Sequence, residues 1–361
     1  MNVLVDINHP AHVHLLRNVF FLLKEKGHEV TVVVKEIPSA MRLLQLYGIP
    51  YVNIGRKDDA LMKKGLDQLV YDHCLSKIVR ERHIDLAIGS SLNVAHVSKL
   101  SKMKSIVMDD DDDEVEPLFV KFGHPFADAI LTPSVIQRKS RNAVYVDSYH
   151  ELAYLHPKRF MPDPSVLHDA GIEEGERFFI LRFNAFKAHH DMGEGGLTAE
   201  DKRQLVQRLQ KHGKVFITTE REIEEEFNLY QLRVSPDKAH SLMYYATMLV
   251  GDSQTMTSEA AVLGTPAVKC NSFAGRLSVP NELERRYGLC YSFLPTQSER
   301  FFAKIDELLA VHDLKEEWQR RRQKMLSEKI DYSAFLTWFI ENYPNSQEVM
   351  KNNPDYQFRF K

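Results

Sequence analysis

Short aliphatic runs alternate with amphipathic stretches along the first part of the chain. VLVDI begins at Val3, and the apolar residues from Leu15 to Leu23 then share one helical face before Gly27. EVTVVV follows, and the same order continues through YVNI, DLAIG, SIVM and AILT. Continuous apolar strands suit a parallel sheet that helices cover on both faces. This alternation therefore predicts a doubly wound α/β domain.

A second domain is predicted after a break in the alternation. Tyr149–Arg177 contains prolines, glycines and mixed charges, which predict a linker. The alternation restarts with FFILR, KVFIT, MLVGD and PAVKC, and Leu314–Tyr343 is predicted to be mostly helical and aromatic-rich. We therefore expect two Rossmann-like domains, about 1–160 and 161–329, facing each other across a cleft that holds the ligand.

Composition supports this organisation and excludes several classes of protein. The chain has 361 residues, which suits two domains, and its 43% hydrophobic and 27% charged residues exclude wholesale disorder. A net charge of -3 does not indicate a nucleic-acid partner. The three cysteines form no CxxC pair, and no long apolar run is present. The first residues show no basic stretch followed by an apolar one, so we expect no signal peptide. We expect a cytoplasmic protein.

The segment GDSQTMTSEAAVLGTPAV, which starts at Gly251, carries the sharpest chemical signal. A predicted strand ends here, and Ser253, Gln254 and Thr255 begin a predicted helix. The first turn of a helix has unpaired N–H groups and partial positive charge, which favour phosphate. Glu259 would repel phosphate but could accept hydrogen bonds from ribose hydroxyls. The alternative interpretation is ordinary helix capping by serine or threonine.

A second candidate is the loop after the first strand, NHPAHVHLL, with His9, His12 and His14. A neutral imidazole can take a proton from an acceptor hydroxyl. Two alternatives are a helix-capping histidine and a histidine-only metal cluster. The metal cluster ranks last because Asp6 is the only carboxylate nearby in the sequence.

A third candidate is LRFNAFKAHHD, which follows the first strand of the predicted second domain. Its cationic side chains could bind phosphate, since arginine forks onto two oxygens and lysine acts as a point charge. We favour Arg182 and Lys187 over His189 and His190. The alternative is a solvated loop.

The acidic run after SIVM is the fourth candidate. Asp109 and Asp110 lie nearest the strand end and are predicted acceptor contacts or an alternative base. For Asp111–Glu114 we favour a solvated loop, since adjacent aspartates repel one another, over a magnesium site. For the basic run Arg320–Arg322 we favour a solvated helix face over contact with an anionic membrane.

These segments resemble known families. The Ser253 loop is similar to the donor-binding segment of GT-B glycosyltransferases, and most of all to that of the non-hydrolysing UDP-N-acetylglucosamine 2-epimerases. His12-Val13-His14 resembles a His-Val-Phe in a GT-B enzyme that glycosylates a lipid-linked precursor. VLVDINHPAHVHLLRN, GHEV, LYGIPYVNIG, AILTPS and YHELAYLHP also resemble the domain of unknown function 354 family, itself of predicted GT-B fold.

The resemblance implies roles for several residues. Ser253–Thr255 would touch the donor diphosphate, Glu259 the ribose, and His12 an acceptor hydroxyl. The tail, about 330–361, would cross back onto the first domain. In the epimerases a Gly-Asp-Thr follows the fourth strand, but Gly89–Ser91 lacks that carboxylate here.

The sequence therefore predicts a glycosyltransferase that uses a nucleotide-sugar donor, with UDP-sugar favoured, in the synthesis of surface polysaccharide or glycoconjugate. The acceptor would be a glycan or a lipid-linked sugar, and peripheral membrane contact is an option. GT-B enzymes as a class need no metal, so none is expected. The alternatives are a UDP-sugar 2-epimerase and a non-catalytic nucleotide-sugar-binding protein.

Overall fold

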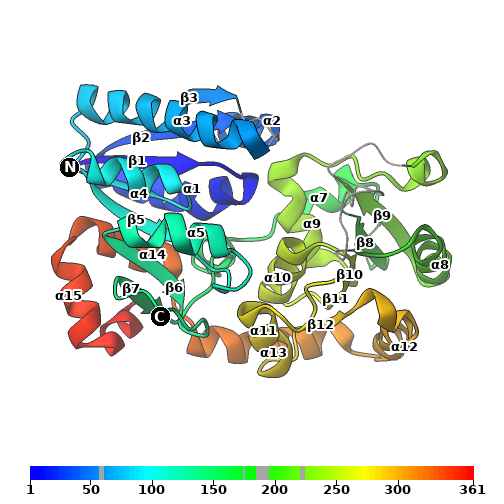
Figure 1. Cartoon of the computed structure of the whole chain (residues 1–361). Helices are drawn as coiled ribbons and strands as arrows, with labels where there is room; N and C mark the ends of the chain where they lie inside the picture. Colours follow the sequence, from blue (N-terminus) through cyan, green and yellow to red (C-terminus); the bar gives the residue numbers. More distant parts are fainter. Residues whose placement is uncertain (57–60, 174, 184–194, 220–223) are drawn as a thin grey trace. The chain divides into compact units, whose positions relative to one another are not determined.

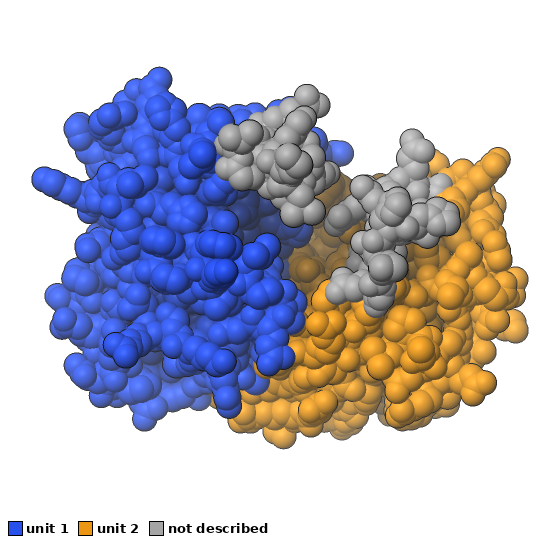
Figure 2. Space-filling model, in the orientation of Figure 1, with its two compact units in different colours: residues 1–159, 329–361 blue, residues 160–328 orange. Residues whose placement is uncertain are grey.

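The chain folds into two compact units. The computed structural model describes residues 1–56, 61–173, 175–183, 195–219 and 224–361. Unit 1 comprises Met1–Arg159 together with Lys329–Lys361, and unit 2 comprises Phe160–Glu328. Figure 2 colours unit 1 blue and unit 2 orange. Each unit has its own parallel sheet and its own buried core.

Unit 1 contains a seven-stranded parallel sheet in the order β3-β2-β1-β4-β5-β6-β7 (Figure 1). Its strands are β1 (Asn2–Ile7), β2 (Glu29–Glu36), β3 (Tyr51–Arg56), β4 (Leu86–Gly89), β5 (Lys104–Met108), β6 (Ala129–Pro133) and β7 (Ala143–Val146). The helices are α1 (Pro10–Glu25), α2 (Pro38–Leu46), α3 (Leu61–Glu81), α4 (Leu92–Lys99), α5 (Pro117–Phe122), the 3-10 turn η1 (His124–Phe126) and α6 (Leu152–Leu155). The strand order reverses between β1 and β4, which is where open α/β sheets bind ligands.

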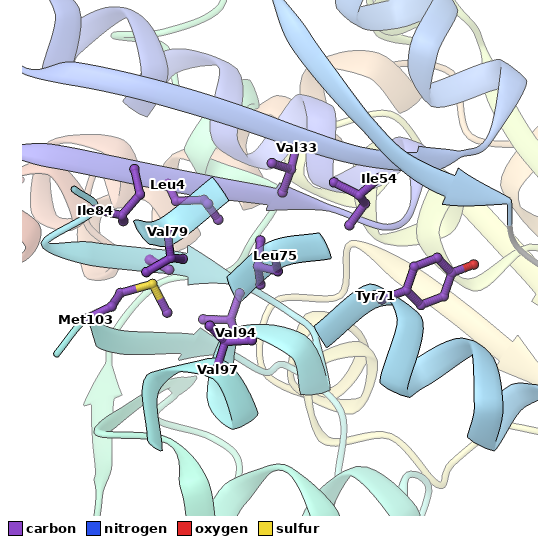
Figure 3. Close-up of a cluster of buried hydrophobic side chains, with 11 residues drawn as sticks. Leu4, Val33, Ile54, Tyr71, Leu75, Val79, Ile84, Val94, Val97 and Met103 are labelled. Atoms are coloured by element: carbon purple, nitrogen blue, oxygen red, sulfur yellow. The ribbon is translucent and has the colours of Figure 1, made fainter. Parts of the chain in front are cut away.

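Residue alternation along the central strands separates the two faces of this sheet. Leu4 and Val33 join a buried cluster with Leu75 of α3 and Val94 and Val97 of α4 (Figure 3). Their strand neighbours Val5, Ile7 and Val32 instead lie with Val13 and Leu16 of α1. Since successive side chains of a strand point to opposite faces, α1 covers one face while α3 and α4 cover the other.

The end of the chain returns to unit 1, as expected. This segment contains α14 (Tyr332–Glu341), α15 (Asn345–Asn352) and the 3-10 turn η5 (Pro354–Phe360), and α14 contacts α1 and α6. The Ile330 N–H donates to the Asp147 carbonyl at 3.0 Å, and the Ser333 hydroxyl donates to the Ala153 carbonyl at 2.6 Å. Buried Phe335 and Phe339 add apolar area, the main favourable term in such packing.

Unit 2 contains a five-stranded parallel sheet in the order β12-β11-β10-β8-β9 (Figure 1). Its strands are β8 (Phe178–Arg182), β9 (Lys214–Thr218), β10 (Met248–Gly251), β11 (Ala267–Cys270) and β12 (Cys290–Phe293). Its helices are α7 (Ser165–Asp169), α8 (Ala199–Leu209), α9 (Ala239–Tyr245), α10 (Gln254–Leu263), α11 (Ser278–Arg285), α12 (Ser298–Leu309) and α13 (Leu314–Glu328), and the 3-10 turns are η2 (Glu225–Tyr230), η3 (Pro236–Lys238) and η4 (Pro295–Gln297). Among the described residues, no helix is both long and apolar enough to cross a membrane.

The predicted linker over Tyr149–Arg177 is wrong. Its first part contains α6, whose four residues are all buried in unit 1, and Tyr149 is fully buried. Its second part contains α7, where Val166 is buried in unit 2. The prolines and glycines that suggested a linker mark turns between short packed helices, and the chain divides between Arg159 and Phe160.

The solvated helix face predicted for Arg320–Arg322 holds for Arg320 only. Arg322 is buried, and its Nε donates to the Val262 carbonyl at 2.9 Å near the end of α10. Arg321 lies over the Trp318 ring at 4.2 Å and donates to the Gly288 carbonyl. The basic run therefore attaches α13 to unit 2, because guanidinium groups can bind the unpaired carbonyls of helix ends and turns.

Candidate functional site

The first candidate site of unit 2 is the beginning of α10. β10 ends at Gly251, and Ser253 caps the helix by accepting from the Met256 N–H at 3.4 Å. The backbone N–H groups of Gln254 and Thr255 lie in the first turn, and the Thr255 side chain is exposed. The Thr257 hydroxyl donates to the Ser253 carbonyl at 2.7 Å, which fixes the cap. This helix end offers donors and partial positive charge to an anion.

Arg182 lies beside this helix end, on the neighbouring strand. It is the last residue of β8 and pairs in register with Gly251 of β10, while its carbonyl accepts from the Asp252 N–H at 3.1 Å. A side chain at Gly251 would collide with the Arg182 backbone, so the glycine permits this approach. The guanidinium is buried and Nη1 contacts the Thr218 hydroxyl at 3.3 Å. Lys187, which is predicted to bind phosphate together with Arg182, lies outside the described residues, as do His189 and His190.

Sequence reasoning missed a second cation at the same helix end. Lys269 of β11 is 1% exposed, and its ammonium donates to the Gln254 side chain at the first position of α10. Burial lowers the pKa of Lys269 to about 8. The available signal was a lysine within the otherwise apolar strand PAVKC. Lys269 therefore adds positive charge next to the predicted phosphate position.

Glu259 lies one turn further along α10 and pairs with a histidine that sequence reasoning also missed. His240 of α9 lies 3.0 Å from Oε1 of Glu259, and both side chains are buried. Phe160 meets the His240 ring edge-on at 6.5 Å. The hydrogen bond fixes the carboxylate orientation of Glu259, as ribose recognition would require.

In unit 1, the three predicted histidines separate into different roles. His9 is the N-cap of α1, where its Nδ1 accepts from the Ala11 N–H at 3.2 Å. His14 is buried, bonds the Tyr47 hydroxyl at 3.2 Å and stacks on Tyr154. His12 is half-buried in the first turn of α1, at the carboxyl end of β1. The helix-capping alternative thus describes His9, and His12 stays a candidate base.

Asp109 is held by a buried histidine and a buried arginine. Its Oδ2 lies 2.7 Å from Nε2 of His124, and its Oδ1 lies 2.8 Å from Nη2 of Arg138. Arg138 also pairs with Asp113 at 2.7 Å. The solvated loop predicted for Asp111–Glu114 is therefore wrong at Asp113. Buried carboxylates need such partners, so Arg138 and His124 allow the acidic run to fold against the sheet.

Unlike Asp109, which contacts His124 and Arg138, Asp110 pairs with His150. Its Oδ2 lies 3.1 Å from Nδ1 of His150, and the Asp110 side chain is 38% exposed. Burial opposes the charge, but the attraction of His150 and His12 outweighs it and lowers the pKa of Asp110. In the sequence, His150 lies within YHELAYLHP, which shows no catalytic pattern. Asp110, His150 and His12 form a group capable of general base chemistry.

The pKa of the next residue, Asp111, shifts in the opposite direction. Burial, followed by repulsion from Asp110 and Glu116, raises the pKa of Asp111 to about 7. Two neighbouring carboxyls with pKa values on opposite sides of the usual range can serve as base and acid. Within the described residues, no cluster of three histidine, cysteine or acidic side chains is placed to hold a metal ion.

Comparison with solved structures defines the fold. Staphylococcus aureus MnaA in complex with UDP matches with a TM-score of 0.69 at 11% identity, over 96% of this chain and 97% of that chain. A Listeria monocytogenes protein assigned as a UDP-N-acetylglucosamine 2-epimerase has a TM-score of 0.66 at 11% identity, over 95% and 96%. The Streptomyces sp. SF2575 glycosyltransferase SsfS6 with thymidine diphosphate has a TM-score of 0.61 at 15% identity, over 94% and 99%. The chain therefore has the GT-B fold.

The family follows from the sequence comparison. Residues 1–283 match the model of the family described as protein of unknown function (DUF354), and the chain belongs to this family. An uncharacterised protein of Methanocaldococcus jannaschii, MJ0665, is 22% identical over 291 residues, which cover 75% of this chain and 82% of that protein.

Proposed function

We propose that this protein is a glycosyltransferase that takes a nucleotide-sugar donor, with UDP-sugar favoured. The observation that carries the proposal is the start of α10, where the Ser253 cap follows Gly251, and Gly251 pairs in register with the buried Arg182 at the end of β8. Similarity to folds that hold UDP and thymidine diphosphate supports a diphosphate at this position. By analogy with such enzymes, the reaction would serve surface polysaccharide or glycoconjugate synthesis in the cytoplasm.

In this proposal unit 2 binds the donor. The N–H groups of Gln254 and Thr255 and the guanidinium of Arg182 bind the diphosphate, and Lys269 adds charge behind them. Glu259, fixed by His240, accepts hydrogen bonds from the ribose hydroxyls. These donors also stabilise the charge on the nucleoside diphosphate as it leaves, which lowers the barrier to transfer.

Unit 1 supplies the base. His12 takes the proton of an acceptor hydroxyl, and Asp110 stabilises the imidazolium that forms. The hydroxyl oxygen forms a bond to the anomeric carbon of the sugar while the bond from that carbon to the diphosphate oxygen breaks. The electron pair of the broken bond leaves with the nucleoside diphosphate. Asp109 is excluded from direct contact in this scheme because His124 and Arg138 engage both of its oxygens.

A charge placed at Thr255 tests the donor site. Thr255→Glu adds a carboxylate at an exposed position in the first turn of α10, where acidic residues normally stabilise a helix. The variant should keep the melting temperature of the wild type, yet lose at least tenfold in UDP and thymidine diphosphate affinity by calorimetry. Thr255→Gln is the matched neutral control. If Thr255→Glu binds both nucleotides as the wild type does, the diphosphate does not lie at this helix end.

A 2-epimerase is the second candidate, favoured by the contrast between Asp110 and Asp111. Elimination and re-addition of UDP at a sugar ring needs a base and an acid, and the pKa values of these two carboxyls lie on opposite sides of the usual range. Incubation with UDP-N-acetylglucosamine and no acceptor distinguishes the candidates by proton NMR. A 2-epimer product indicates epimerase activity. Binding without any turnover, even with acceptors present, indicates a non-catalytic sensor.

A further inference from the structure

His150 is the side chain that fixes Asp110, and the returning end of the chain fixes His150. The imidazole bonds Asp110 through Nδ1 at 3.1 Å. On one face it stacks on the Tyr332 ring of α14, with centroids 5.6 Å apart and an interplanar angle of 19°. His150 is 12% exposed and Tyr332 is 2% exposed, so neither ring is free to rotate away.

The hydrogen-bonding capacity of the pair determines where the proton lies. An ionised carboxylate can only accept, so Nδ1 of His150 carries the hydrogen that bonds Oδ2 of Asp110. The other ring nitrogen, Nε2, is buried and has no hydrogen-bond partner among the described residues. Turning the ring over would leave the carboxylate without its donor. The ring is therefore held in one orientation, with its donor directed at Asp110.

The difference in exposure between the two partners assigns their roles. The Asp110 side chain is 38% exposed, while that of His150 is nearly buried. A substrate can therefore reach the carboxylate but not the imidazole nitrogens, of which one is engaged and the other is buried. His150 acts through Asp110 and does not touch the substrate itself.

We propose that His150, clamped by Tyr332, is the positioning residue of Asp110: it fixes one carboxylate oxygen and directs the other toward the substrate and His12. This inference rests on the proposed function, in which Asp110 supports the base. It gives the C-terminal segment a part in the catalytic edge of unit 1, because Tyr332 enters with α14.

The pair lies in a strongly charged environment, which a test must take into account. Among the described residues, the groups that face it are His12 of α1, Asp109 and Asp111 of the acidic run, Glu116 before α5, Glu151 before α6, and Tyr332 of α14. The acidic neighbours favour a charged His150, and His12 favours a charged Asp110. Burial opposes the charge on His150, but attraction to Asp110 outweighs it and raises the pKa of His150.

Nitrogen-15 NMR of the histidine rings tests the contact without any substrate. The His150 signals are assigned from their loss in His150→Asn, and the titration is followed between pH 5 and 9 in the whole chain. In Asp110→Asn, the His150 midpoint should fall by one pH unit or more, a tenfold change in proton affinity. His96, which pairs with Asp72 at 3.2 Å, is the internal control and should not move. An unchanged His150 midpoint would overturn the proposal.

Turnover of a UDP-sugar then tests the positioning role. In His150→Phe, kcat should fall at least tenfold with KM for the donor within twofold, and the acidic limb of the pH profile should move up by about one unit. His150→Asn, whose amide can still donate to Asp110, should recover most of kcat. Tyr332→Phe keeps the stacked ring and should lose less of kcat than Tyr332→Leu, which should resemble His150→Phe.

The outcomes separate this inference from the proposed function. A merely structural His150 would lower the melting temperature without moving the pH profile, and would overturn the inference. If the wild type neither binds UDP nor turns over a UDP-sugar, the proposed function fails while the NMR result still decides whether His150 fixes Asp110.

Discussion

Replacing Gly251 with alanine should damage unit 2 at the edge that holds the proposed donor site. Gly251 is the last residue of β10 and pairs with Arg182 of β8. A Cβ at this position would lie 2.0 Å from the Arg182 carbonyl oxygen, 2.9 Å from its carbon and 3.0 Å from its nitrogen. All three atoms belong to the backbone, so no rotamer change relieves the contact. The two strands must move apart.

The loss of stability can be estimated from the hydrogen bond that breaks when the two strands separate and from the overpacking that the added methyl group causes. The Asp252 N–H bonds the Arg182 carbonyl at 3.1 Å, and separation of the strands would lose a ladder bond worth about 1 kcal/mol. Overpacking in a well-packed interior costs about 1–3 kcal/mol more. We therefore expect unit 2 to lose about 3 kcal/mol, which for a urea dependence of about 2 kcal/mol per molar lowers its midpoint by about 1.5 M.

The two tryptophans of the chain allow each unit to be followed separately. Trp318 lies in unit 2, where it is 1% exposed and donates to the Leu289 carbonyl at 2.8 Å, and Trp338 lies in α14 of unit 1. Urea unfolding is followed by fluorescence in Trp338→Phe and Trp318→Phe backgrounds. Gly251→Ala should shift the Trp318 transition and leave the Trp338 transition in place.

A second glycine provides the control. An added Cβ at Gly195, also in unit 2, meets no atom of the described residues within 4 Å. Gly195→Ala should therefore leave the Trp318 midpoint within about 0.3 M of the wild type, as surface substitutions do. If Gly251→Ala and Gly195→Ala give the same midpoint, the close approach of β10 to β8 does not constrain unit 2. Glycine would then not be needed to bring Arg182 to the helix end.

Three further predictions concern the donor site. Arg182→Lys should weaken UDP binding about tenfold by calorimetry, because an ammonium cannot fork onto two phosphate oxygens; an unchanged Kd would place the diphosphate elsewhere. UDP affinity should fall as the pH rises from 7 to 9, since a bound anion favours the charged form of Lys269, whose pKa is about 8, and this dependence should vanish in Lys269→Gln. Glu259→Gln should reduce the preference for UDP over its 2′-deoxy analogue, measured as the ratio of the two Kd values, whereas a constant ratio would contradict ribose contact.

The sequence predicted the fold well because hydrophobic periodicity is a local property. Strands such as Val3–Ile7 and Phe178–Arg182 are apolar except for Asp6 and Arg182, and predominantly apolar strands are typical of parallel sheets. The periodicity did not detect β7 (Ala143–Val146), a short edge strand with an exposed tyrosine. It also misjudged Tyr149–Arg177, because proline and glycine mark chain reversals without telling whether the segments between them are buried.

The candidate site residues that the sequence did not indicate were missed for a different reason. His150, His240 and Lys269 each gain their role from one partner distant in sequence, namely Asp110, Glu259 and Gln254. A single histidine or lysine carries no spacing to recognise, and its environment exists only after folding. Residues next to strand ends, such as Ser253 and Arg182, could be predicted because parallel topology alone brings strand ends to one edge.

The acidic run shows how folding distributes roles among identical residues. Arg138 forms an ion pair with both Asp109 and Asp113, and His124 contacts the remaining carboxylate oxygen of Asp109. Removal of Asp109 would leave a buried guanidinium underpartnered, which costs about 3–5 kcal/mol, so Asp109→Asn should act on the stability of unit 1. Asp110 is partly exposed, and its counter-charges among the described residues are His150 and His12, so Asp110→Asn should cost little stability and most of the turnover. Of these two adjacent aspartates, Asp109 would stabilise the fold and Asp110 would take part in the reaction. The roles differ because the side chains of neighbouring residues after a strand point in different directions.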